Sequence, residues 1–408
     1  MASLRIASSR TSLLALAAVA SLGAAGLPAQ QPVTRREAVA AALARGPRVV
    51  LAATDTAAAR ADLMTARAFQ NPTLSASYSK DVPQYHASLD LPLDLPWLRS
   101  ARIRVAAEAR TSARFRFTFE RASARFDAEG AYTAALAAAA RARLSRRNAL
   151  DADSLLRMAA LRRDAGDASE LDVQLANVNA GQLANDAAGD SANAVTALLD
   201  VQRVMGLAAD RPAIALADTL DLPAPDTAGA AGPALQVAAA EATARSADAA
   251  LSLARRSVFA SPSLMLGFDS HDPSGAETGV LPTFGLVLTF PLLSWNHGGI
   301  AAAAAARDRA QAELVLARRE SDAAVAEARR DLAVATGKVT RDRALVASAD
   351  RVAAMSLTAY AEGAVALPSV LEAQRQAREA LGHLIDDLAV ASTADAAVRL
   401  FTASEVSP

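Results

Sequence analysis

The side chains that usually carry enzyme chemistry are few in this sequence of 408 residues. It has no cysteine, which excludes disulfides, thiol catalysis and cysteine-based zinc sites. The pair Gly337-Lys338 lacks the upstream glycine of a phosphate-binding loop. The histidines show no close ligand spacing: they are His86, His271, His297 and His383. We therefore expect no catalytic residues, no cofactor and no metal site.

Two polar groups are the alternatives to that expectation. His86 and Asp90 share one face of a predicted strand, and Asp269, His271 and Asp272 lie at or beside a predicted outer loop. Either group offers nitrogen and oxygen ligands for a cation. Ordinary polar residues of the strand face and of the loop are the default explanation for both groups.

The composition favours long helices over a compact globular core. Hydrophobic residues make up 52 % of the chain but aromatic residues only 4 %, because alanine dominates. Alanine has the highest helix propensity but buries little area. Charged residues make up 21 % and the net charge is −1, which argues against disorder and against a nucleic-acid partner.

One segment is nevertheless basic. Residues 99–147 contain 12 arginines and 4 acidic residues. Nucleic-acid binding is one interpretation. Attraction of Arg99, Arg102 and Arg104 to anionic lipid headgroups is better motivated, and a solvated helix face explains the rest.

The N-terminus has the pattern of a secretory signal peptide. Arg5 and Arg10 precede an apolar run, Ser12–Leu22, which is followed by small residues and Pro28. The alternative is a membrane anchor, but this run is short for a span of about 20 residues. We expect residues 1–29 to be removed and the mature protein to leave the cytoplasm.

The first half of the mature chain alternates between helix and strand periodicity. Thr34 and Glu37 form a predicted capping box, which starts a helix running to about Phe69. Asn71-Pro72 ends that helix, because the residue before a proline avoids the α region. The segments that follow are a β-hairpin at 73–93, a long helix at 99–164, a return helix at 169–205 and a linker at 206–233.

The second half repeats this order. Its predicted segments are a helix at 234–259, a β-hairpin at 263–290, a long helix at 298–361, a return helix at 367–401 and a short tail at 403–408. Landmarks correspond at offsets of about 190 to 197 residues: Pro72 with Pro262, Trp97 with Trp295, Met158 with Met355, and Gly166 with Gly363. We interpret residues 34–205 and 234–402 as two copies of one structural unit.

Both hairpins have one apolar and one polar face. The apolar positions are Leu74, Ala76, Tyr78, Ala87, Leu89, Leu91 and Leu93 in the first, and Leu264, Leu266, Phe268, Phe284, Leu286, Leu288 and Phe290 in the second. Such alternation, beside helices too long to cover it, is typical of a transmembrane barrel with an outer lipid face. Four strands cannot close a barrel, so several chains must share one. Trp97 and Trp295 then suit the membrane interface.

The chain resembles the TolC-type outer-membrane efflux proteins, over about residues 34–402. The resemblance is carried by the strand entries Asn71-Pro72 and Ser261-Pro262, by the strand exits Leu91–Asp94 and Phe290–Leu293, and by two tip signatures. These tip signatures are Arg163–Gly166 with Leu171–Val173, and Tyr360–Gly363 with Val370–Gln374. Residues Pro96–Arg102 look most like the branch that serves heavy-metal or cation exporters.

The resemblance implies a mainly α fold with a small β part. Three chains would form a 12-stranded outer-membrane β-barrel on a long periplasmic α-helical barrel. The homotrimer would be a passive exit duct for small molecules or metal ions. It would contact outer-membrane lipid, a periplasmic adaptor (membrane fusion) protein and, through it, an inner-membrane pump.

The resemblance also assigns residues at the periplasmic mouth. Glu372 matches an acidic position inside the closed mouth, and Asp172 and Tyr360 match positions that link neighbouring helices there. Gly166 and Gly363 mark the adaptor-docking tips. A ring of Glu372 carboxylates would attract cations. The other acidic position of the family is Ser369 here, which predicts a thinner ring, and ordinary surface roles are the alternative for all three residues.

Two other functions remain as alternatives. A structural coiled-coil protein of the envelope would have no transport role, but the chain lacks sustained large heptad residues. A soluble periplasmic enzyme or binding protein would need a pocket-forming core, which this composition hardly supports.

Overall fold

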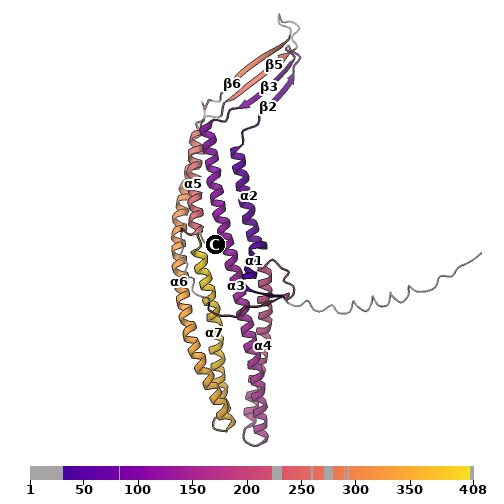
Figure 1. The fold of residues 1–408 in the computed structure, drawn as a ribbon, viewed down its shortest axis with the longest axis vertical. Helices are drawn as coiled ribbons and strands as arrows, with labels where there is room; N and C mark the ends of the chain where they lie inside the picture. The colour runs from indigo at the N-terminus through magenta and orange to yellow at the C-terminus, as the bar shows by residue number, and fades with distance from the viewer. Residues whose placement is uncertain are drawn as a thin grey trace, which may run out of the picture. The chain divides into compact units, whose positions relative to one another are not determined.

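A computed structural model describes residues 31–81, 83–222, 232–258, 261–270, 279–288, 290–291 and 294–404. The predicted signal peptide, His271 and Asp272 of the second hairpin, Leu292 and Leu293 lie outside the described residues. Figure 1 shows the elements in chain order. They are β1 (Gln31–Val33), α1 (Arg35–Arg45), α2 (Pro47–Arg67), β2 (Thr73–Tyr78), β3 (Tyr85–Pro92), α3 (Pro96–Asp164), α4 (Glu170–Val204), β4 (Ile214–Leu216), α5 (Leu235–Arg256), β5 (Ser263–Ser270), β6 (Val280–Val287), α6 (His297–Ala361) and α7 (Leu367–Phe401).

The described chain divides into two compact units. The first unit contains the residues up to Ala40, Ala131–Leu220 and Ala349–Ile385. The second contains Ala41–Gly130, Asp221–Ser348 and the residues from Asp386. The long helices α3 and α6 each contribute to both units, so each unit takes elements from both halves of the sequence.

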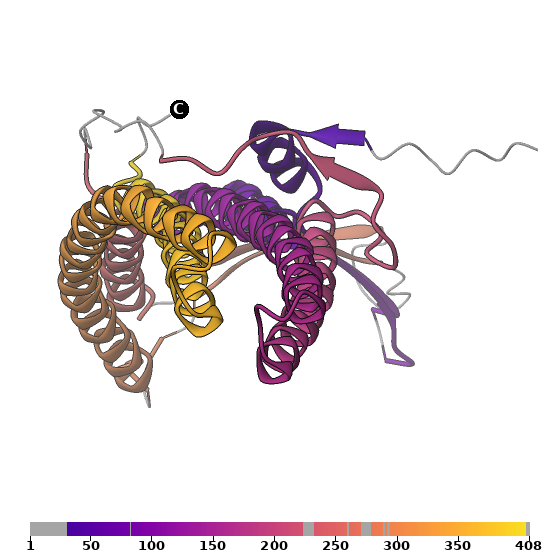
Figure 2. The same ribbon diagram turned by 90° about the horizontal axis from the view of Figure 1, so that it is seen from below.

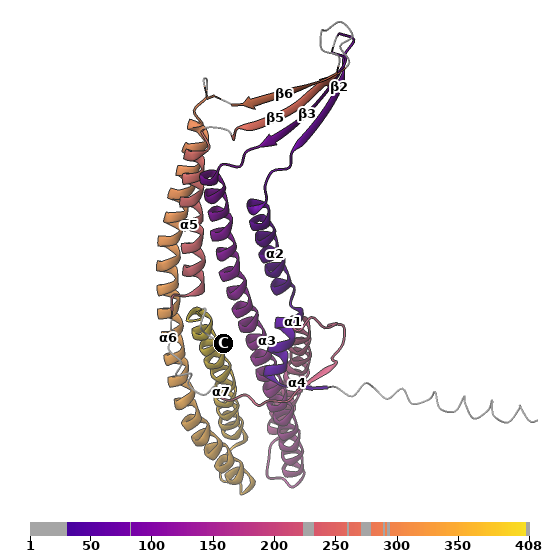
Figure 3. The ribbon, with the colours of Figure 1, turned by 45° about the horizontal axis from the view of Figure 1, so that its top comes forward.

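The second unit contains a four-stranded antiparallel sheet in the order β2-β3-β5-β6. The strands lie side by side beyond the ends of α2, α3, α5 and α6 (Figures 1 and 3). Strand β3 of the first hairpin pairs with β5 of the second, so the two predicted hairpins form one sheet. Strands β2 and β6 are its outer strands, and each has one edge unpaired among the described residues.

The predicted helix from Thr34 to Phe69 is wrong in one respect, because the structure has two helices there. The capping box is confirmed: Thr34 N donates to Glu37 Oε2 over 2.8 Å, and Glu37 N donates to Thr34 Oγ1 over 3.3 Å. Helix α1 then stops, and Gly46 takes an extended backbone before Pro47 starts α2. A Cβ at Gly46 would lie 2.4 Å from the carbonyl oxygen of Ala42, so only glycine fits there.

The other elements lie near their expected ranges, with shifted ends. Helix α3 begins at Pro96 rather than Arg99, since proline is accepted in the first turn of a helix. Strand β6 covers Val280–Val287 rather than 283–290, so Leu288 and Phe290 lie beyond it. Seen along the helices in Figure 2, α4 folds back on α3 and α7 folds back on α6. Within the first unit these two helical hairpins pack on each other through a shared apolar cluster.

The predicted linker at 206–233 contains a strand that the sequence analysis missed. Strand β4 pairs in parallel with β1, with Gln31 opposite Ile214. The ribbon is fixed to α3 by Tyr132, whose hydroxyl donates to the carbonyl oxygen of Val33 over 2.7 Å and accepts from Asp218 N over 3.3 Å. The buried amide of Gln202 holds the preceding turn through the backbone of Ala208, Arg211 and Ala213.

Small residues fill the contacts between helices, as the composition predicts. In the second unit, Ser112 of α3 donates to the carbonyl oxygen of Ala239 in α5 over 3.1 Å, and its oxygen lies 2.8 Å from Thr243 Oγ1. Alanines supply much of the buried surface around them, including Ala238, Ala242 and Ala249. Helices with small contact residues can approach each other closely, which suits a thin wall better than a thick core.

Candidate functional site: an apolar sheet face and two helical tips

The register of the sheet puts the predicted apolar residues in rows on one face. One row crosses all four strands as Leu74, Leu89, Leu266 and Phe284. Leu91, Leu264 and Leu286 form the row on one side of it, and Ala76, Ala87, Phe268 and Pro282 form the row on the other. Leu74 is 75 % exposed and Phe284 77 % exposed, so this face is open in the single chain. Tyr78 is also exposed, as are Leu288 and Phe290 beyond β6.

The opposite face of the sheet is mainly polar. Ser75 lies opposite Ser88, and Ser77 lies opposite His86. His86 Nδ1 lies 2.7 Å from Asp269 Oδ1 on β5, which ties the two hairpins together on this face. Asp90, which we expect on the same face as His86, has one buried carboxylate oxygen without a hydrogen-bond partner among the described residues.

His86 also has a serine beside its other nitrogen. Ser79 Oγ lies 3.4 Å from His86 Nε2, so Ser79, His86 and Asp269 occur in the order of a catalytic triad. The Ser79 hydroxyl donates instead to the carbonyl oxygen of Asp81 over 2.7 Å. With its proton directed away from His86, Ser79 is not activated as a nucleophile, and these contacts fasten the β2–β3 turn.

Arg99 and Arg102, for which we expect attraction to lipid headgroups, are partly exposed and also make hydrogen bonds and ion pairs within the chain. Arg99 Nη2 donates to the carbonyl oxygen of Arg67 over 2.8 Å, and Arg102 Nε donates to that of Ala66 over 3.1 Å. Both also pair with the buried Asp94. These guanidinium groups cap the C-terminus of α2, where the helix dipole attracts a cation.

Trp97 and Trp295, predicted at the membrane interface, are both exposed.

Each helical hairpin of the first unit turns at a glycine, as predicted. We call residues 164–170 the first tip and residues 361–367 the second tip. Gly166 and Gly363 have φ angles of +86° and +78°, which favour glycine. In both tips the glycine N–H donates to the carbonyl oxygen three residues before it. The N–H of the next residue donates to the carbonyl oxygen five residues before it, as in a Schellman motif. The two tips are therefore the same turn, used twice.

Tyr360 lies between the two helical hairpins, in the apolar cluster behind the tips. The cluster comprises Leu155, Ala159, Val173, Ala176, Tyr360, Leu367 and Val370. Tyr360 is 3 % exposed, and burial raises the pKa of its hydroxyl, while Arg162 opposes and Asp172 adds to that effect. Besides the apolar side chains of this cluster, Arg162 of the first hairpin also contacts Tyr360, and its guanidinium lies 4.6 Å from the ring centroid. The sequence analysis did not single out Arg162.

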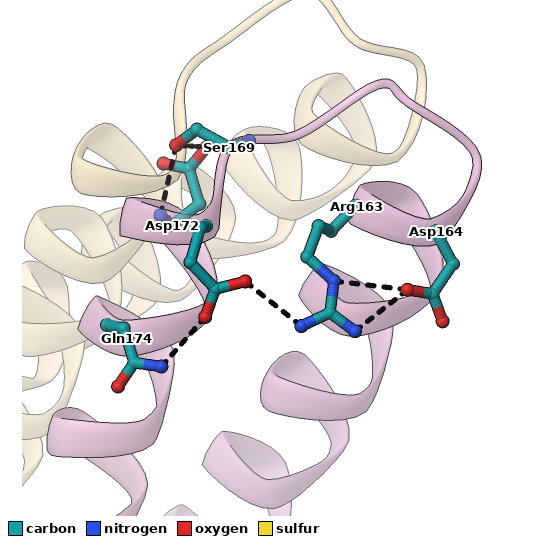
Figure 4. A network of polar contacts seen from close by, with 6 residues as sticks. Arg163, Asp164, Ser169, Asp172 and Gln174 are labelled. Atoms are coloured by element: carbon teal, nitrogen blue, oxygen red, sulfur yellow. Dashed lines mark hydrogen bonds and ion pairs between the residues drawn. The ribbon is translucent and has the colours of Figure 1, made fainter.

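Asp172 caps its own helix. Its Oδ2 accepts from Ser169 N over 3.0 Å and from Ser169 Oγ over 2.9 Å, and Asp172 N donates to Ser169 Oγ over 3.1 Å. Figure 4 shows this capping box beside the contact of Arg163 with Asp164. Arg163 also donates to Glu170 over 3.1 Å. Within the described part of the single chain, these hydrogen bonds tie Asp172 to the cap of its own helix.

Glu372, the predicted mouth carboxylate, is exposed on α7 and paired with a cation. Arg375 donates to both of its oxygens, over 2.6 and 2.9 Å, and Gln376 donates over 2.8 Å. These hydrogen bonds lower the pKa of Glu372 to about 2, so it is ionised at neutral pH. Arg375 also contacts Glu379, so the local group contains two carboxylates and one guanidinium.

No helix among the described residues is both long and apolar enough to cross a membrane. No group of three or more histidine, aspartate or glutamate side chains in the described part of the chain has the geometry to hold a metal ion.

Comparison with known proteins identifies the fold. No protein-family profile and no curated protein matches the sequence. A membrane protein from Pseudomonas aeruginosa matches in structure with a TM-score of 0.77 and 21 % identity, over 90 % of this chain and 93 % of that one. The outer membrane protein VceC from Vibrio cholerae matches with a TM-score of 0.75 and 15 % identity, over 90 % and 95 %. CusC, described in connection with transmembrane channel formation, matches with a TM-score of 0.76 and 16 % identity, over 94 % and 95 %.

These likenesses extend over nearly the whole described chain and nearly the whole of each matched protein. The chain therefore has the fold of outer-membrane channels of the TolC type: mainly α, with long helices and a small β part. The fold expected from the sequence resemblance is confirmed.

Proposed function

We propose that this protein is the outer-membrane exit duct of a tripartite efflux or export system. As a homotrimer it passes small molecules or metal ions passively from the periplasm to the outside. It resides in the outer membrane with a large periplasmic portion, and it catalyses no reaction. Its partners are a periplasmic adaptor and, through it, an inner-membrane pump.

The observation that carries this proposal is the exposed apolar face of the β2-β3-β5-β6 sheet. A row from Leu74 to Phe284 has no covering layer among the described residues, while the other face is mainly polar. Strands of eight residues extend about 26 Å, close to the apolar band of outer-membrane barrels, which is about 25 Å tall. In a barrel built from this sheet, lipid outside covers the apolar face and water inside hydrates the polar face.

The unpaired edges of β2 and β6 support the trimer. Four strands are too few for a barrel, which needs about eight or more. Pairing β2 of one copy with β6 of the next satisfies the backbone groups of both edges, and three copies give the 12 strands that the resemblance implies. In this barrel the lipid-facing residues are Leu74, Tyr78, Leu89, Leu91, Leu264, Leu266, Phe268, Phe284, Leu286, Leu288 and Phe290. Trp97 and Trp295 lie at the membrane interface.

The tips support the periplasmic end of the proposal. Gly166 and Gly363 are the turns that an adaptor would dock against, and Glu372, Asp172 and Tyr360 lie behind them. Because each Glu372 carries its own Arg375, a three-fold ring would alternate in charge rather than be purely anionic.

Native mass spectrometry of the mature protein, extracted from membranes in mild detergent, tests the assembly. We expect the mass of three chains and a requirement for detergent. Planar-bilayer recording on the same sample tests the pore, with discrete conductance steps expected. A detergent-independent monomer would contradict the shared barrel. A trimer without conductance would favour the alternative, a structural coiled-coil protein of the envelope.

A further inference from the structure

The two tips of one chain are joined by one aromatic side chain. Tyr360 is next to the last residue of α6, and its ring enters the cluster formed with Leu155 and Ala159 of α3 and Val173 of α4. Burial of the ring favours keeping the two helical hairpins together, because separating them would expose it to water. The hairpins therefore have a contact at the tips whose strength depends on what surrounds Tyr360.

Arg162 adds two contacts between the hairpins and one within the first tip. Its guanidinium stacks on the Tyr360 ring, 4.6 Å from the centroid, and Nη1 donates to the carbonyl oxygen of Tyr360. Nη2 lies 3.5 Å from the carbonyl oxygen of Asp167 in the first tip. A cation is favoured at the C-terminus of α6, and the planar guanidinium can stack and donate at once. Arg162 thus connects the first tip to the end of α6.

This contact occurs only once in the duplicated sequence. Counted back from the tip glycines, the position of Arg162 before Gly166 corresponds to Ala359 before Gly363. Alanine cannot reach the opposite hairpin. The connection therefore depends on a single arginine of the first repeat.

The hydroxyl group of Tyr360, in contrast, disfavours the contact between the two helical hairpins. It is buried and has no hydrogen-bond partner among the described residues. Asp172 is close enough to act on it electrostatically, but Oδ2 of that carboxylate is occupied by Ser169 N and Oγ. A buried hydroxyl without a partner is unfavourable, and separation of the tips would return it to water.

We propose that Arg162 holds the two tips of each chain together and that the Tyr360 hydroxyl opposes this closure. This differs from the role implied by the family resemblance, in which Tyr360 and Asp172 link neighbouring helices. The inference rests on the proposed function only where it equates closed tips with a closed mouth. Arg162 is a positioning residue that regulates opening, and contacts no transported molecule in this assignment.

The distance between the tips tests the proposal directly. The chain has no cysteine, so Asp167→Cys with Glu362→Cys places one spin label on each tip without background labelling. Labelled chains are diluted into unlabelled ones, so that distances within one chain dominate, and pulsed electron paramagnetic resonance gives the distance distribution. We expect Arg162→Ala to raise the ratio of long to short distances by about tenfold. Tyr360→Phe, which keeps the ring and loses the hydroxyl, should lower that ratio.

Two further variants serve as controls. Arg163→Ala removes the neighbouring arginine, which contacts Asp164 and Glu170 of its own hairpin, and should leave the distances unchanged. Arg162→Lys keeps the charge but loses the planar group, and should lie between wild type and Arg162→Ala. It also keeps the test valid if Arg162→Ala misfolds, which circular dichroism of the helices would reveal.

The outcomes separate the parts of the proposal. Unchanged distances in both folded Arg162 variants would overturn the role of Arg162. Longer distances in Tyr360→Phe would overturn the role of the hydroxyl and show that it bonds across the tips, with Asp172 as the acceptor. If wild type shows no conductance in bilayers while the distance shifts follow our expectation, the proposed duct fails and the tip assignment stands.

Discussion

Leu89 of β3 lies directly opposite Leu266 of β5, at the junction where strands from the two halves of the chain pair. The same row continues to Leu74 at one edge and Phe284 at the other. The next row along the strands carries Ser75, Ser88, Gly267 and Thr283 on the opposite face. The two neighbouring residues Leu74 and Ser75 are therefore both exposed in the single chain but face opposite sides of the sheet.

Arginine at these two positions should have opposite consequences. Leu74→Arg puts a charge on the proposed lipid face, which costs about 2–4 kcal/mol near the middle of a bilayer. Ser75→Arg puts the same charge on the water side. We expect Leu74→Arg to lower the yield of trimer in the outer membrane strongly and Ser75→Arg to lower it little, measured by membrane fractionation. Equal yields would argue against lipid contact, since a water-exposed sheet would accept both.

The charge at Glu372 should influence ion selectivity through Arg375. We expect Glu372→Gln to reduce cation selectivity only modestly, because Arg375 already offsets that carboxylate. Arg375→Gln should increase cation selectivity more, since it releases both Glu372 and Glu379. Reversal potentials in asymmetric salt measure both effects. If both variants match wild type, the residue lies outside the narrow part of the conduction path.

A buried ion network in the second unit should make stability depend on acid. Glu129 is 7 % exposed, and burial alone would raise the pKa of its carboxyl. Hydrogen bonds from Arg125 and Arg399 outweigh burial and bring the pKa below its ordinary value of 4.5. A lowered pKa in the folded state means that this stabilisation is complete above about pH 4.5 and is lost as the pH falls through the folded value.

We therefore expect Glu129→Gln to lower stability by about 3 kcal/mol at pH 7, the lower end for breaking a buried pair. The difference from wild type should shrink toward pH 3. Urea unfolding followed by circular dichroism at several pH values measures both. Glu313→Gln, which removes an exposed partner of Arg309 one helical turn away, is the matched control and should change little. If the stability difference between Glu129→Gln and wild type does not change with pH, the ionisation assigned to Glu129 is wrong.

Glycine is required between α1 and α2 but not inside α4. Gly46→Ala places a methyl group 2.4 Å from the carbonyl oxygen of Ala42, so we expect a loss of about 1–3 kcal/mol as the backbone shifts. Gly189→Ala meets nothing within 4 Å and should stabilise α4 by about 0.5–1 kcal/mol. Thermal unfolding midpoints should therefore move in opposite directions. A neutral Gly46→Ala would show that the break between the helices relaxes freely.

Local patterns made much of the fold predictable from the sequence. Alternation of apolar and polar residues indicated both hairpins, and a glycine with positive φ marked each tip. The break at Gly46-Pro47 had a local signal too, because proline commonly occupies the first turn of a helix. The alanine-rich pattern on both sides hid it.

The contacts that the sequence did not reveal join residues far apart in the chain. Arg162 and Tyr360 are 198 positions apart, and neither carries a motif that names the other. Strand β4 has three residues, too few for alternation to be visible, and its partner β1 lies at the other end of the first repeat, just before Thr34. The capping box at Ser169 and Asp172 was readable from its spacing, but the family resemblance directed attention to Asp172 as a mouth residue.

The parallel ribbon of β1 and β4 has a consequence for the order of folding. Residues of β1 are synthesised early, yet their partners in β4 come 183 positions later. A pairing with that separation closes a large loop, and its entropic cost delays it. The helical hairpin of α3 and α4 is more local and can form earlier. Strands β1 and β4 should thus be among the last parts of the described chain to gain protection from hydrogen exchange during refolding.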